Sequence, residues 1–140
     1  MRAILKLKGW KMASILILED EMSIRMLLAK VFQMKGHDVL AFEDARPALE
    51  SVDLDEVDLI ITDYNMPMRG DIAVREIRDR GYDLPVIVMS GYLDEEIIDV
   101  LEGLAVQKIL WKPFPPFDLV DVVEEILSRL FETSRAGIFE

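Results

Sequence analysis

The stretch Leu59-Ile60-Ile61-Thr62-Asp63 decides the fold, because it is a short apolar run that ends on an acidic residue. Its length and its aliphatic and β-branched composition favour a buried strand over a helix. An ionised side chain at the end of a buried strand is costly unless the protein uses it. Three other apolar runs also end on polar side chains: Ile15–Leu18 before Glu19 and Asp20, Val86–Met89 before Ser90, and Ile109–Trp111 before Lys112.

The segments between these runs have helical periodicity. After the first run, apolar residues recur at the i, i+3, i+4, i+7 and i+8 spacing of one helix face, and Gly36 marks the end of the stripe. Residues 37–42 form a weaker strand of mixed polarity, as expected at a sheet edge. Asp44 and Asp71 are expected to cap the two following helices. The alternation predicts an α/β fold with a doubly wound sheet of five parallel strands in the flavodoxin-like order 2-1-3-4-5, with five helices.

The length of 140 residues fits one domain, which we place at residues 13–131. Residues 1–12 are expected to be a disordered leader and residues 132–140 a C-terminal tail. A formal net charge of −11 argues against a surface for duplex nucleic acid or for an anionic membrane. No apolar stretch is long enough to cross a membrane.

The composition also excludes several kinds of chemistry. The chain has no cysteine, which rules out disulfides, thiolate catalysis and zinc bound by cysteine. The single histidine, His37, cannot build a histidine metal site or a Ser-His-Asp relay. We interpret it as a surface residue at the start of the edge strand.

The predicted strand order brings acidic side chains together. Strands one and three are neighbours about 4.8 Å apart, so Glu19, Asp20 and Asp63 are expected to share one pocket. Lys112 alone cannot neutralise them, so either some carboxylates are protonated or a cation lies among them. Oxygen ligands without His or Cys favour Mg²⁺, which suits phosphoryl chemistry. Asp63 could then act as a nucleophile, while Lys112 offsets charge and Ser90 donates a hydrogen bond.

Four strings, at residues 15–21, 60–67, 88–91 and 112–114, resemble in order and spacing the receiver domain of bacterial response regulators. The resemblance covers residues from about 14 to 130. It implies that a sensor histidine kinase or a histidine phosphotransfer protein phosphorylates Asp63. It implies Mg²⁺ bound by Glu19, Asp20, Asp63 and the main-chain carbonyl of Asn65, with Ser90 and Lys112 reading the phosphoryl group. Asn65 and Tyr92 would tune the lifetime of the phosphate, and the Lys112–Pro113 bond would be cis.

The resemblance further implies a cytoplasmic signalling protein rather than an enzyme acting on an external substrate. Without an effector domain in this sequence, a stand-alone receiver would give its output by binding an unknown downstream protein. Three departures from the family pattern stand out. Glu19 replaces the more usual Asp, the loop at residues 67–70 is one residue short, and Ile109 replaces a usual aromatic residue, which puts the usual output switch in question.

The sequence leaves two alternative functions open. One is a degenerate receiver that binds partners without phosphorylation, which the complete set of acids, Ser90 and Lys112 disfavours. The other is a small Mg²⁺-dependent phosphatase that forms an aspartyl phosphate. Such phosphatases carry the nucleophile after the first strand and a second Asp two residues on, where this chain has Asn65.

Overall fold

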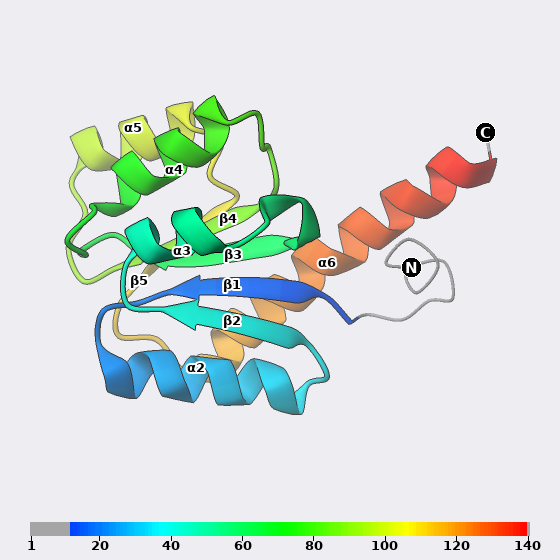
Figure 1. Cartoon of the computed structure of the whole chain (residues 1–140), viewed down its shortest axis with the longest axis horizontal. Helices are drawn as coiled ribbons and strands as arrows, with labels where there is room; N and C mark the ends of the chain where they lie inside the picture. Colours follow the sequence, from blue (N-terminus) through cyan, green and yellow to red (C-terminus); the bar gives the residue numbers. More distant parts are fainter. Residues whose placement is uncertain (1–11, 140) are drawn as a thin grey trace.

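The computed structural model describes residues 12–139 and has helices on both faces of a central sheet (Figure 1). The expected leader therefore lies outside the described residues, apart from Met12. The described part contains five strands, five α-helices and one 3₁₀ turn, in the order β1 Ser14–Leu18, α2 Met22–Met34, β2 Asp38–Phe42, α3 Ala45–Ser51, η1 Leu54–Glu56, β3 Leu59–Asp63, α4 Gly70–Asp79, β4 Val86–Ser90, α5 Glu95–Gly103, β5 Lys108–Trp111 and α6 Pro116–Phe139.

The five strands are all parallel and lie in the order β2-β1-β3-β4-β5, which confirms the predicted topology. Every residue of β3 and β4 is buried, as expected for strands covered on both faces. β2 is largely exposed, which agrees with its place at an edge. The strand order reverses between β1 and β3, so a crevice is expected at their carboxyl ends.

The helices form two layers, one on each face of the sheet. Helices α2 and α6 cover one face, and α3, α4 and α5 cover the other (Figure 1). Each layer closes one apolar cluster against the strands. The largest fully buried side chains come mainly from the strands and include Ile15, Leu16, Ile60, Ile61 and Ile87. The core thus fixes the strands and leaves their carboxyl ends to carry polar residues.

Several element ends match the sequence pattern and others do not. Gly36 and Gly81 follow α2 and α4 with φ of +92°, a left-handed conformation that glycine adopts without strain. Helix α6 continues through residues 132–139, the segment expected to be a tail. Within the described part, no helix combines the length and apolar character needed to cross a membrane.

Two expected helix caps do not form, and the expected surface position of His37 is wrong. Asp44 precedes α3, but its carboxylate accepts from the backbone N–H of Met68 at 2.9 Å instead of from a helix amide. Asp71 lies inside the first turn of α4 and pairs with Arg69, which occupies the cap position. His37 is only 6% exposed. A short-range pattern does not reveal a partner such as Met68, which lies 24 residues from Asp44.

Candidate functional site

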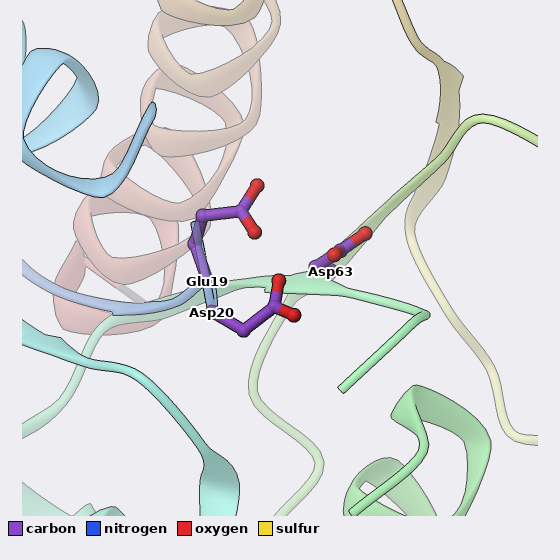
Figure 2. Close-up of side chains that lie close together, drawn as sticks. All are labelled: Glu19, Asp20 and Asp63. Carbon is purple, nitrogen blue, oxygen red and sulfur yellow. The ribbon is translucent and has the colours of Figure 1, made fainter. Parts of the chain in front are cut away.

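Three carboxylates meet at the carboxyl ends of β1 and β3. Glu19 and Asp20 directly follow β1, and Asp63 is the last residue of β3. Figure 2 shows their side chains close together, and one carboxylate oxygen from each residue lies within 4.8 Å of the other two. Glu19 and Asp63 are buried, whereas Asp20 is exposed. This arrangement gives a cluster of hard oxygen donors that opens to solvent on the side of Asp20.

Lys112 brings the only positive charge that the described ion pairs place against this cluster. Its Nζ lies 2.5 Å from Glu19 Oε1 and 3.4 Å from Asp63 Oδ1. The shorter contact is therefore with Glu19 rather than with Asp63. Lys112 follows β5, and its backbone N–H donates to the carbonyl of Ser90 at 2.8 Å. The Lys112–Pro113 peptide bond is cis, as expected.

One lysine does not balance the negative charge of three carboxylates, and the pKa values of Glu19 and Asp63 are raised. Burial, with repulsion from Asp63, raises the pKa of Glu19 to about 7 despite its contact with Lys112. Burial also raises the pKa of Asp63, against the attraction of Lys112. A divalent cation would remove this penalty, because it favours the ionised form of every carboxylate that contacts it. Oxygen donors of this charge and number fit Mg²⁺.

Ser90 lies beside this cluster at the end of β4, where the hydroxyl is fully buried. Its Oγ donates to the carbonyl of Tyr92 at 2.8 Å and accepts from the backbone N–H of Tyr92 at 3.2 Å. The side-chain amide of Asn65 also donates to it, at 3.4 Å. A serine hydroxyl has one proton, so Ser90 would have to release the Tyr92 carbonyl before donating to a phosphoryl group.

The short loop between β3 and α4 packs directly against the site. The backbone N–H of Gly70 donates to the carbonyl of Tyr64 at 2.8 Å. A Cβ atom at Gly70 would lie 2.8 Å from the Cα of Tyr64 and 2.9 Å from the carbonyl oxygen of Asp63. Arg69 stacks over the Tyr64 ring at 5.8 Å and pairs with Asp71. Gly70 thus lets the loop approach the backbone of Asp63, a role that the sequence analysis missed.

We expect Gly70→Ala to lower the free energy of unfolding by about 2 kcal/mol, because both close contacts are with backbone atoms that cannot move aside alone. Gly103→Ala is the matched control, since a Cβ there meets nothing within 4 Å. That control should be neutral or stabilise by up to about 1 kcal/mol. Urea unfolding measures both. Equal effects of the two substitutions would contradict the close packing at Gly70.

The raised pKa of Glu19 predicts how stability depends on pH. Between pH 4.5, its ordinary pKa, and about 7, the folded protein binds more protons than the unfolded chain. The stability of the metal-free protein should therefore fall as pH rises through this window. Glu19→Gln should flatten this part of the curve, and Mg²⁺ should stabilise the wild type most at the upper end. Urea unfolding in EDTA and in MgCl₂ measures this. A curve that Glu19→Gln leaves unchanged would contradict the assignment.

Comparison with known proteins identifies the family. Residues 15–124 match the family described as the response regulator receiver domain. The chain belongs to this family. A receiver domain is the phosphoacceptor module of two-component signalling, and the topology and polar strand ends described above agree with that membership.

Curated relatives and solved structures agree with the assignment. The transcriptional regulatory protein PdtaR of Mycobacterium tuberculosis is 32% identical over 120 residues, which cover 84% of this chain and 58% of PdtaR. The alkaline phosphatase synthesis transcriptional regulatory protein PhoP of Bacillus subtilis is 32% identical over 117 residues, covering 82% of this chain and 48% of PhoP. The chain thus spans about half the length of these receiver-containing relatives.

Among solved structures, the chemotaxis protein CheY4 of Vibrio cholerae aligns with a TM-score of 0.76 at 28% identity. That alignment covers 82% of this chain and 98% of CheY4. The relatives also include the sensor kinase CckA of Brucella abortus, of which the chain covers 13% at 32% identity. Receiver domains of this type therefore occur both in regulators and within a kinase.

The structure brings the predicted site residues to one end of the sheet. Glu19, Asp20 and Asp63 lie together, and Lys112 contacts Glu19 and Asp63. Ser90 adjoins Lys112 through the end of β4. Tyr92 is 68% exposed, with only its backbone held by Ser90. Ile109 is partly buried among the apolar side chains that pack under α4 and α5. An aliphatic side chain therefore lies at the position for which the family resemblance implies an aromatic one.

Proposed function

We propose that Asp63 is the phosphoacceptor of this receiver and that its phosphorylation requires Mg²⁺. The observation that carries the proposal is the buried carboxylate of Asp63, with Glu19 and Asp20 on one side and Lys112 3.4 Å away. A carboxylate so placed can attack phosphorus directly, and Lys112 together with a bound divalent cation would offset the negative charge of the phosphoryl oxygens.

In the transfer step, one Asp63 oxygen forms a bond to phosphorus as the phosphorus–nitrogen bond of a phosphohistidine breaks. The electron pair of that bond stays on the imidazole nitrogen, so no oxidant or reductant is needed. Glu19, Asp20 and the main-chain carbonyl of Asn65 would hold Mg²⁺. The bound ion would neutralise charge on the phosphoryl oxygens. Lys112 would exchange its contact with Glu19 for one with the phosphoryl group, and Ser90 would donate its hydroxyl proton to another phosphoryl oxygen.

The partners follow from this chemistry. The phosphodonor would be a sensor histidine kinase or a histidine phosphotransfer protein in the cytoplasm. The phosphorylated surface would be read by a downstream protein, and the net charge of −11 supports neither nucleic acid nor an anionic membrane as that partner. The chain would assist only its own phosphorylation and dephosphorylation. The complete set of acids, hydroxyl and lysine argues against a degenerate receiver.

The test is to incubate the purified chain with acetyl phosphate, with Mg²⁺ or with EDTA, and to measure the intact mass. We expect one added phosphoryl group with Mg²⁺ and none with EDTA. Peptide mapping after reduction of the acyl phosphate should place the label on Asp63. A label on another residue, or equal labelling in EDTA, would contradict the proposal.

A further inference from the structure

Ala13, the residue directly before β1, is hydrogen-bonded to a histidine side chain at the amino-terminal end of the strand. The backbone N–H of Ala13 donates to Nδ1 of His37 at 3.1 Å, and the carbonyl of Ala13 accepts from the N–H of Asp38 at 2.9 Å. Both residues are buried, with 3% and 6% exposure respectively. His37 thus extends the β1–β2 pairing by one residue, using a ring nitrogen where a backbone carbonyl would normally serve.

Two contacts position His37, and its contact with Ala13 requires one protonation state of the ring. Its backbone N–H donates to the carbonyl of Phe32 at 3.1 Å, and the two rings lie 6.1 Å apart. An imidazole nitrogen accepts a hydrogen bond only when it carries no proton. The contact with Ala13 therefore requires the neutral ring with its proton on Nε2. In the imidazolium form, two N–H donors would face each other and the bond would be lost.

The surroundings also offer the protonated ring a favourable alternative. Burial lowers the pKa of His37, and three carboxylates oppose this shift: Glu124 of α6, Asp38 of β2 and Asp58 ahead of β3. Lys35, directly after α2, pairs with Glu124 at 4.0 Å, and Glu56 lines the same pocket as His37. Glu124 and Lys35 are each more than 40% exposed, so their ion pair is weak and competes little with the attraction between Glu124 and an imidazolium ring.

We propose that His37 is a pH-operated latch on the start of β1, in which the neutral ring holds Ala13 in the sheet and the protonated ring releases it. The next residue along, Ser14, is held by another side chain, because its N–H donates to Asp58 Oδ2 at 2.8 Å. Acid would therefore release Ala13, directly ahead of β1, and leave β1 itself paired from Ser14 onward. The phosphorylation site lies at the opposite, carboxyl ends of the strands, so the latch acts independently of it.

The test is amide hydrogen exchange followed by NMR on the full 140-residue chain between pH 7.5 and 5.0. Protection is expressed relative to the intrinsic exchange rate at each pH. We expect the protection of the Ala13 amide to fall by up to about tenfold per pH unit once the ring begins to protonate. The amide of Ile61, in the centre of the sheet, should keep its protection. A parallel loss at Ile61 would mean general unfolding and would overturn the proposal.

His37→Asn is the matched variant, because the asparagine Oδ1 can accept the Ala13 N–H but does not titrate in this range. It should keep Ala13 protected at every pH, and the same fall as in the wild type would overturn the proposal. If the variant does not fold, the ¹⁵N shift of Nδ1 in the wild type decides. Nδ1 should become protonated over the pH range in which Ala13 loses protection. If Nδ1 stays unprotonated across that range, the proposal is overturned.

Discussion

Replacing Asp63 with Asn is expected to abolish phosphorylation by acetyl phosphate or by a kinase. The amide oxygen is not a competent nucleophile towards phosphorus, and the side chain of Asn65 cannot supply the missing carboxylate. We expect the rate of labelling to fall at least about 100-fold, which corresponds to about 2.7 kcal/mol in the barrier. Intact-mass measurements over time, in the presence of Mg²⁺, provide the rate.

The same substitution should leave the fold intact and stabilise the metal-free protein. It removes one of three mutually repelling carboxylates, two of which are buried, so we expect a gain of about 1 kcal/mol at neutral pH. Urea unfolding in EDTA measures this gain. Asp118→Asn, an exposed acid in the first turn of α6, is the control and should change neither rate nor stability appreciably. Full labelling of the Asp63 variant would contradict the assignment of Asp63 as the phosphoacceptor.

The site could be predicted from the sequence because its residues follow strands that can be recognised locally. Asp63, Ser90 and Lys112 each end an apolar run, and the parallel topology carries all such ends to one edge of the sheet. The alternation of strands and helices sets that topology. The distances between the site residues cannot be predicted in this way. Nothing in the sequence indicates that Lys112 lies closer to Glu19 than to Asp63.

Two of the residues that the sequence analysis misjudged, His37 and Asp44, bond to backbone groups far away in the sequence. His37 was predicted at the surface, yet its ring accepts from Ala13, 24 residues earlier. Asp44 was predicted to cap α3, yet it accepts from Met68, also 24 residues away. The short loop at residues 67–70 was noted, but the role of Gly70 was missed because it is a close approach to the backbone of Asp63 and not a left-handed turn. Periodicity reports which face a residue occupies, but it does not report such pairings.

Arg78 also bonds to backbone groups far away in the sequence, and it supports the largest stability prediction. Its guanidinium, at the end of α4, donates only to main-chain carbonyls among the contacts described. Nε donates to Leu104 at 2.9 Å, Nη1 to Tyr82 and Leu84 at 3.1 and 2.8 Å, and Nη2 to Ala105 at 3.2 Å. Ala105 has φ of +58°, an uncommon conformation for a residue with a side chain. Arg78 therefore ties the loops before β4 and before β5 to α4.

Arg78→Met should lower the free energy of unfolding by about 3 kcal/mol, because it leaves four carbonyls without their charged donor in a partly buried position. Arg78→Lys should recover at most about 1 kcal/mol, since an ammonium group cannot span both loops as the planar guanidinium does. Arg75→Met, on the exposed face of the same helix, should stay within about 0.5 kcal/mol of the wild type. Urea unfolding measures all three. A loss at Arg78 no larger than that at Arg75 would mean that the two loops keep their conformation without the guanidinium, and the left-handed Ala105 would then need another source of support.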